Sequence, residues 1–151
     1  MTRVTDLAKA LRSLNLRAEL PKMIERQKQV PIDINRDQLL HGLTSEGETG
    51  TNLRGYRNFD YAVKKNQMNS LPEFGVADLK LTGAFYSKFD LKADATTYTL
   101  FSSDPKADEL ELSYTLFIFG IQGRNIYKWA DALFINEIKP YIEGKTGLLM
   151  R

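Results

Sequence analysis

The segment at residues 78–91, DLKLTGAFYSKFDL, constrains the fold more than any other part of the chain. Apolar Leu79 and Leu81 alternate with polar neighbours, and the alternation resumes after Gly83. A period of two is typical of a strand with one buried face and one solvent-exposed face. A single glycine is too short for a hairpin loop, so Gly83 indicates a bulge or bend within the strand. We therefore expect this segment to form the central strand of a sheet.

Other segments supply a partner strand and several helices. Residues 96–103 alternate in the same way after a turn at Asp94, which predicts an antiparallel partner strand. Residues 105–118 fit a helix that starts at Asp104, and they also fit a strand. Apolar residues recur at helical spacing over three further segments, residues 5–19, 54–67 and 125–140. The predicted class is α+β, with a small antiparallel β-sheet flanked by N-terminal, middle and C-terminal helices.

A chain of 151 residues is expected to form one domain. Val30, Ile32 and Ile34 alternate with Pro31 and Asp33, which predicts a short edge strand or an extended arm. The sequence TSEGETGTN has too few apolar groups to bury itself, which predicts a mobile loop. The expected parts are an N-terminal helix with the extended arm (1–43), the mobile loop (44–52), an α+β core (53–140) and a C-terminal tail (141–151).

Composition excludes several classes of protein. The net charge is +2, with 21 basic and 19 acidic residues, whereas a strongly basic balance is typical of a domain that binds a phosphate backbone. The absence of cysteine excludes disulfides and thiolate metal sites. No run of 18 consecutive apolar residues is present, so we expect no membrane-spanning segment. The seven tyrosines and eight phenylalanines suit both a core and subunit contacts.

Catalytic and metal-binding motifs are missing from the sequence. His41 is the only histidine, which argues against triads and histidine-based metal sites. The segment at 47–55 has glycines but lacks the Gly-Lys-Ser/Thr of a phosphate-binding loop. Residues 33–44 open like a calcium loop, but Gln38 stands where glycine is needed and Thr44 where glutamate is needed. We therefore expect no enzymatic activity, no cofactor and no metal.

One group of basic residues gives an alternative function. Two tyrosines, Tyr56 and Tyr61, are interleaved with these cations on the predicted middle helix. Cations and aromatic rings together are typical of nucleic-acid binding, although such a helix is more often a solvated face. The alternative prediction is a small nucleic-acid-binding module. Its contacts would be Arg54, Arg57, Lys64 and Lys65.

The order of features over residues 42–140 resembles a known family. A glycine-rich polar loop is followed by a lysine-bearing helix, a Leu-Thr-Gly strand start, a second strand and a closing Phe-Gly segment before a C-terminal helix. This order is similar to that of the tail-completion and virion-morphogenesis proteins of tailed phages, the neck or head-to-tail connector family, and to phage proteins of gut Bacteroidetes. The matching positions are Tyr61, Lys64, Leu81, Thr82, Gly83, Phe85, Phe119 and Gly120.

The resemblance implies a structural subunit of the virion, assembled in the host cytoplasm, that forms a ring around the DNA channel. Its partners would be copies of itself and neighbouring connector, portal or tail proteins. A ring uses heterologous contacts, so each subunit needs two different adhesive surfaces. We expect these in the extended arm, on the exposed face of the central strand and in the apolar tail. The candidate interface residues are Val30, Ile32, Ile34, Tyr86, Lys88, Leu148, Leu149 and Met150.

Overall fold

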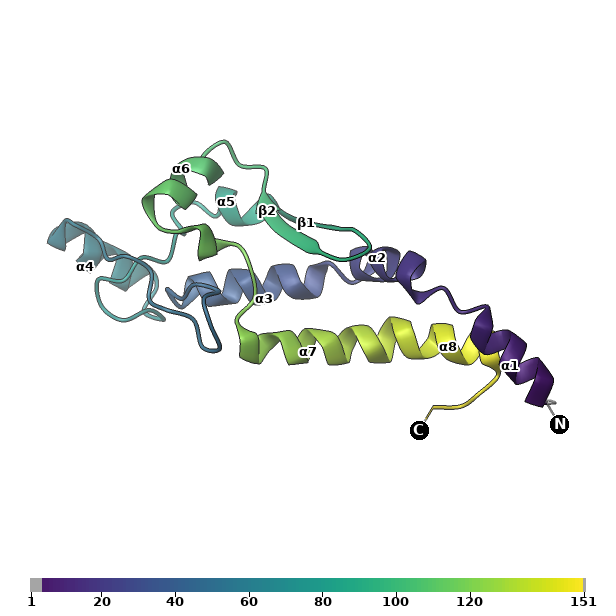
Figure 1. Cartoon of the computed structure of the whole chain (residues 1–151). Coiled ribbons are helices and arrows are strands. Elements are labelled where there is room, and N and C mark those ends of the chain that lie inside the picture. The colour runs from purple at the N-terminus through teal and green to yellow at the C-terminus, as the bar shows by residue number, and fades with distance from the viewer. Residues whose placement is uncertain (1–3, 151) are drawn as a thin grey trace.

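The computed structural model describes residues 4–150 and has an α+β architecture (Figure 1). Two antiparallel strands form its sheet, and helices make up most of the remainder. In chain order the elements are α1 (Val4–Arg12), α2 (Leu16–Arg26), α3 (Gln29–Leu40), α4 (Phe59–Met68), α5 (Ala84–Ser87), β1 (Phe89–Ala93), β2 (Tyr98–Ser102), α6 (Ala107–Ser113), η1 (Leu116–Ile118), α7 (Gly123–Leu133), η2 (Phe134–Ile138) and α8 (Lys139–Thr146).

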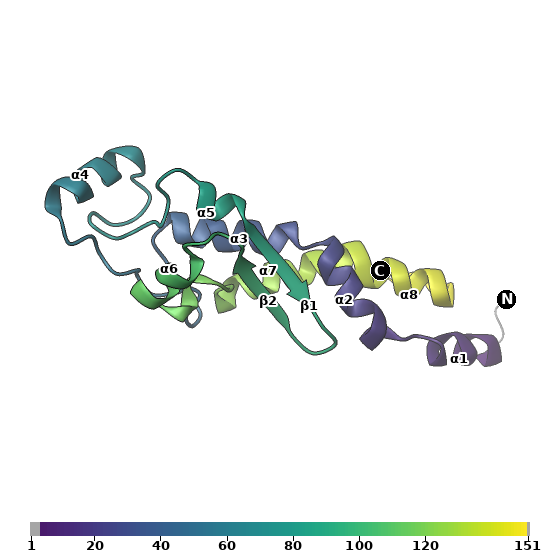
Figure 2. The same cartoon turned by 90° about the horizontal axis from the view of Figure 1, so that it is seen from above.

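The molecule is elongated (Figures 1 and 2). The long helix formed by α7, η2 and α8 runs beside α2 and α3, and α1 packs against its far end at α8. The β1–β2 hairpin packs on α2 and α3, and its Tyr98 ring meets Trp129 of α7 edge-on at 4.7 Å between centroids. α4 lies at the end of the molecule opposite α1. This arrangement leaves α4 and the outer side of α7 uncovered.

The hairpin confirms the predicted partner strand and turn. Leu91 of β1 stands opposite Leu100 of β2, and both side chains are buried. The Asp94 carboxylate closes the turn by accepting hydrogen bonds from the amides of Thr96 and Thr97, each at 2.8 Å. Side chains of this kind favour turns because they replace backbone partners. The sheet therefore has one face on the core, as alternation predicts.

The predicted central strand is correct only in its last part. Residues 79–83 form a bend, and the strand begins at Phe89, after α5. Gly83 is special in its backbone, with φ of 87°, but it precedes α5 instead of forming a bulge. Leu81, expected in the core, is 63% exposed. The alternating pattern is misleading here because the backbone of this bend forms hydrogen bonds with side chains and not with a neighbouring strand.

The predicted extended arm is a helix. Residues 30–34 belong to α3, and Pro31 is tolerated there because it lies in the first turn. The buried positions of α3 follow a helical period, but two of them carry amide side chains, which hides the period in the sequence. These buried positions are Pro31, Ile32, Asn35, Gln38 and Leu39.

The two buried amides of α3 bind the backbone that leads into α7. Asn35 Nδ2 donates to the carbonyl of Ile118 at 3.0 Å, and Gln38 Nε2 donates to that of Gly120 at 3.1 Å. Gln38 Oε1 accepts from the amide of Gln122 at 2.9 Å. Buried polar groups need such partners, so these contacts fix the position of α7 against α3.

The first predicted helix, residues 5–19, is broken in two. It is interrupted after Arg12, and Asn15 caps α2 by accepting from the amide of Ala18 at 3.3 Å. Met23 and Ile24, which follow Pro21 in α2, are 1% and 9% exposed. The C-terminal half of α2 is therefore part of the core.

The loop at 44–52, predicted to be mobile, is a closed turn with many contacts. The amide of Thr44 donates to the carbonyl of Thr51 at 2.8 Å, and Gln122 Nε2 donates to the carbonyl of Thr44 at 3.2 Å. The amide of Gly123 donates to the carbonyl of Gly47 at 2.9 Å. Backbone contacts replace the apolar burial that the loop lacks, and they hold it on the start of α7.

The C-terminal helices also differ from expectation. α6 begins close to Asp104, which accepts from the amide of Lys106 at 3.0 Å, but it ends at Ser113 instead of reaching Ile118. The last helix continues past Pro140 to Thr146, so the predicted tail at 141–151 is helical over its first half. The proline is tolerated because η2, a π-helical turn, precedes it and widens the helix.

The core is one contiguous cluster drawn from both halves of the chain. Phe85 and Phe89 meet edge-on at 4.9 Å between ring centroids, and Phe119 packs against Phe89 at 5.3 Å. Its buried apolar members are Met23, Ile24, Ile32, Leu39, Leu53, Ala77, Phe85, Tyr86, Phe89, Leu91, Leu100, Ala107, Ile118, Ile121, Trp129 and Leu133.

Candidate functional site

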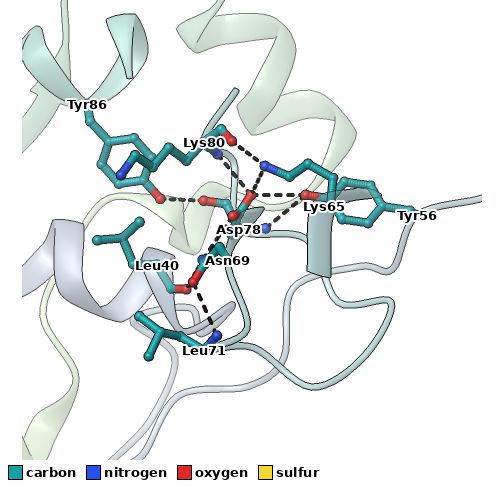
Figure 3. A network of polar contacts seen from close by, with 8 residues as sticks. All are labelled: Leu40, Tyr56, Lys65, Asn69, Leu71, Asp78, Lys80 and Tyr86. Atoms are coloured by element: carbon teal, nitrogen blue, oxygen red, sulfur yellow. Dashed lines mark hydrogen bonds and ion pairs between the residues drawn. The ribbon is translucent and has the colours of Figure 1, made fainter. Parts of the chain in front are cut away.

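The carboxylate of Asp78 is the centre of a buried polar network (Figure 3). Asp78 is 2% exposed, and its ionic partner, Lys65 of α4, is 3% exposed. Lys65 Nζ lies 2.7 Å from Asp78 Oδ1 and also donates to the carbonyl of Lys80. Asn58 fixes the start of α4 by accepting from the amide of Tyr61 at 2.9 Å. Lys65, in the last turn of α4, therefore points inward to Asp78, at the start of the bend that follows α4 in the chain.

Further donors surround the same carboxylate. The Tyr56 hydroxyl donates to Asp78 Oδ1 at 3.0 Å, Asn69 Nδ2 donates to Oδ2 at 2.9 Å and the amide of Lys80 donates to Oδ1 at 3.1 Å. On the other side, the Tyr86 hydroxyl donates to the main-chain carbonyl of Asp78 (Figure 3). Asp78 thus connects α4, α5 and the segments on either side of α4.

The charge on Asp78 is held by these donors. Burial opposes ionisation, but hydrogen bonds from Lys65 and Asn69 and the amide of Lys80 outweigh it and keep the pKa of Asp78 below its usual range. Burial, and then the negative charge of Asp78, raise the pKa of the Tyr86 hydroxyl far above its usual value. Asp78 is therefore an anion fully occupied by contacts, which suits a structural part better than proton transfer.

The backbone next to Asp78 is strained. Leu79 has φ of 50°, in the left-handed region that costs a residue with a side chain about 1–2 kcal/mol. Asp78 Oδ1 accepts from the Lys80 amide and Lys65 donates to the Lys80 carbonyl, so the peptide units before and after Lys80 are both held in place. Strain of this kind persists only where the surroundings over-determine it.

A cavity of about 310 Å³ opens beside the network. Leu79 and Lys65 line it from the network, and Tyr61 of α4 lines it from the side. Leu110 of α6 and Tyr114, just beyond α6, also line it. The strained bend thus forms one wall of a hollow of ligand size.

The structure overturns part of the predicted interface. Ile32 is 2% exposed and lies in the core. Val30 and Ile34 are half-buried on α3, where they line an open hollow of about 400 Å³ together with Lys128 of α7. These three residues are helical, so they do not form an extended arm.

The remaining predicted interface residues divide in the same way. Tyr86 is 7% exposed and was wrongly expected on the surface, because its ring packs on the core while its hydroxyl reaches Asp78. Lys88 is exposed and forms an ion pair with Asp104 at 3.2 Å. Leu148 and Leu149 are 42% and 86% exposed. Met150 is half-buried.

The four predicted basic residues do not share one face. Arg54 and Arg57 are exposed in the segment before α4, and they line an open hollow of about 620 Å³ with Tyr114. Lys64 is exposed on α4. Lys65 was wrongly expected on this surface, because the next position of a helix turns its side chain by about 100° and here directs it to Asp78.

Large apolar side chains are exposed at many positions of residues 4–150, and two groups of them, one near α4 and one on the C-terminal helix, bear on association. At the α4 end, Phe59, Met68, Leu71 and Phe74 are 70%, 65%, 56% and 55% exposed, and the rings of Phe59 and Phe74 lie 5.7 Å apart; we call these four residues the α4 patch. On α7 and η2, Tyr127, Phe134 and Ile135 are 69%, 40% and 61% exposed, and we call these three residues the α7 patch. Exposed apolar residues that gather on one element mark sites of association more often than isolated exposed residues do.

Comparison with protein-family models, curated proteins and solved structures gave no match. Within residues 4–150, no group of three or more His, Asp or Glu side chains is placed to hold a metal ion. No helix in that part of the chain has the length and apolar character needed to cross a membrane.

Sequence reasoning did not find the Asp78 network. Its members lie far apart along the chain, and no local spacing links Tyr56 or Lys65 to Asp78. One signal was present: Asp78 stands between apolar Ala77 and Leu79 in a segment that must be buried on one face. A charged residue at such a position needs a partner.

Proposed function

We propose that this chain is a non-enzymatic structural subunit of a tailed-phage virion, a head-to-tail connector or tail-completion (neck) protein that forms a homo-oligomeric ring around the DNA channel. It would assemble in the host cytoplasm, with copies of itself and with connector, portal or tail proteins as partners. The resemblance of residues 42–140 to the neck family supports the virion part of the proposal. One observation from the fold carries the assembly part, and it is the amount of exposed surface.

The chain exposes far more surface than a monomer of its mass. Its accessible surface is 9816 Å². A compact monomer of 17.2 kDa is expected to expose about 7,800 Å². The excess of about 2,000 Å² is close to what a subunit buries in two standard interfaces, at about 800 Å² each. The elongated shape therefore fits a subunit with a neighbour on each side.

The two apolar patches supply the different surfaces that such contacts need. The α4 patch lies at one end of the molecule, whereas the α7 patch lies on the long C-terminal helix (Figures 1 and 2). A heterologous interface joins unlike surfaces and closes into a ring when the rotation between copies allows it. Aromatic residues such as Phe59, Phe74 and Tyr127 are favoured as the central anchors of interfaces.

The test uses two charged variants at exposed positions. Phe59→Glu/Phe74→Glu disables the α4 patch, and Tyr127→Glu/Ile135→Glu disables the α7 patch. Native mass spectrometry and light scattering should show a ring for the unmodified chain and monomers for each variant alone. A mixture of the two variants retains one intact contact, so it should give dimers with one copy of each. A matched control, Thr97→Glu at the hairpin turn, should leave the ring unchanged.

Three results would contradict this proposal. A monomer at high protein concentration, absent from purified virions by mass spectrometry, would remove both parts of it. An unmodified dimer that neither variant disrupts would show that association uses other surfaces. Failure of the mixed dimer to form would exclude a heterologous contact between these patches.

The hollow between the segment before α4 and α6 favours one alternative function, nucleic-acid binding. Arg54 and Arg57 line this hollow together with Tyr114, and cations beside an aromatic ring are suited to single-stranded nucleic acid. Replacing Arg54, Arg57 and Lys64 by Gln should then abolish binding to single-stranded DNA. The affinity of the unmodified chain should fall steeply with salt. Absent or salt-independent binding would exclude this alternative.

A further inference from the structure

We propose that the cavity beside the Asp78 network is a binding site for a carboxylate carried on an apolar body. The claim goes beyond assembly, because it assigns a ligand chemistry to a site inside one subunit. The cavity of about 310 Å³ has the volume typical of a small-molecule site. Its walls combine apolar and cationic groups, and each of these two features restricts the ligand.

The apolar part of the site accepts a hydrocarbon or aromatic body. Leu79, Leu110 and Phe85 contribute to its wall, and Tyr61 and Tyr114 also line it. A highly hydrated anion such as phosphate would lose water against these side chains without recovering it. The lining therefore favours a ligand with most of its surface apolar.

The cationic part of the site accepts a single negative group. Lys65 has three N–H donors, and Asp78 and the Lys80 carbonyl accept two of them. The third has no acceptor within residues 4–150. Lys80 and Lys106 line the same cavity, are exposed and have no ion-pair partner in that part of the chain. The carboxylate of Asp104, which also lines the cavity, is already paired with Lys88 at 3.2 Å.

The buried pair explains how the site is kept in shape without a ligand. Lys65 Nζ lies 2.7 Å from Asp78 Oδ1, and the contacts of both residues with Lys80 fix the strained bend at Leu79 that forms one wall. A site held by its own contacts is preorganised, so the ligand does not have to order the wall when it binds.

The test compares three probes by NMR titration of the amides of residues 79–84. Phenylacetate carries both features, phenylacetamide lacks the charge and acetate lacks the apolar body. Phenylacetate should bind at least tenfold more tightly than either of the others. Lys80→Gln and Lys106→Gln should each weaken it at least threefold, whereas Lys92→Gln, an exposed lysine on β1 away from the cavity, should not change it. Equal binding of phenylacetate and phenylacetamide, or no effect of either cavity variant, would overturn the proposal.

The ligand has two possible sources, a free small acid or an acidic side chain of a neighbouring copy. Titration of the Tyr127→Glu/Ile135→Glu variant, which keeps the cavity in a monomer, gives the affinity of the empty site. The same affinity in the assembled chain indicates a free small acid, and a loss on assembly indicates that a neighbour occupies the site. Binding to the monomer does not depend on ring formation, so the two proposals can fail separately.

Discussion

Removing either member of the buried ion pair should destabilise the chain, and the two losses should be unequal. Lys65→Met leaves the Asp78 carboxylate with donors from Tyr56, Asn69 and the Lys80 amide. Asp78→Ala leaves the Lys65 ammonium with only the Lys80 carbonyl as a polar partner. It also removes the acceptor of Tyr56 and Asn69. Asp78→Ala should therefore cost more than Lys65→Met.

The size of the loss follows from burial. Breaking a buried pair typically costs about 3–5 kcal/mol. We expect about 4–5 kcal/mol for Asp78→Ala and about 3 kcal/mol for Lys65→Met. The corresponding falls in Tm are about 8–20 °C and about 6–12 °C.

Urea unfolding at pH 7, followed by the fluorescence of the single buried Trp129, measures these differences. Lys28→Met is the matched control, because it breaks the ion pair with Asp90 whose side chains are 46% and 44% exposed. It should cost at most about 1 kcal/mol. The double variant Lys65→Met/Asp78→Ala should lose less than the sum of the single variants, by about 2 kcal/mol. A loss below about 1 kcal/mol for Asp78→Ala, or a larger loss for Lys65→Met, would refute this account of the network.

Two further outcomes are expected. Folding lowers the pKa of Asp78, so its contribution to stability is complete above its unfolded pKa of about 3.9 and is lost as the pH falls through the lower folded pKa. Urea unfolding between pH 6 and pH 3 should therefore show that the free energy of unfolding falls more steeply for the unmodified chain than for Asp78→Ala. Parallel curves would contradict this assignment. Gly50→Ala should lower the free energy of unfolding by about 1–3 kcal/mol, because Gly50 has φ of 77° and a Cβ there would meet Gln122 and the Thr44 carbonyl. Gly47→Ala is the control, because a Cβ there meets open space, and thermal unfolding should show a loss of stability at least about 1 kcal/mol smaller. Equal losses would mean that the loop at 44–52 does not pack on Gln122.

The sequence predicted the α+β class, the hairpin and most helical regions because their signals are local. Leu91 and Leu100 alternate with polar neighbours, and Asp94 marks the turn between them. α3 was missed because Asn35 and Gln38 occupy buried positions, and their partners lie more than 80 residues away. Amides at core positions cannot be recognised until the backbone that they bind is in place.

The candidate site was harder to predict for the same reason. Lys64 and Lys65 are adjacent and chemically alike in the sequence, yet one is exposed and the other is buried against Asp78. Only the direction of α4 relative to the bend at Leu79 separates them. Exposure at the α4 and α7 patches is likewise a property of what the fold leaves uncovered, which apolar content alone does not reveal.

The π-helical turn at Phe134–Ile138 divides the C-terminal helix into two parts that contact different segments of the chain. Before it, Trp129 faces the hairpin; within and after it, Glu137 accepts from Arg26 at 2.6 Å and the Tyr141 hydroxyl accepts from the amide of Asn15 at 3.3 Å. Each residue turns a helix by about 100°, so deleting one residue here would rotate α8 by that angle while leaving α7 in place. The docking of α1 and α2 on this helix is therefore sensitive to a single insertion or deletion in the turn, which would also move Ile138 and Tyr141 on the edge of the core.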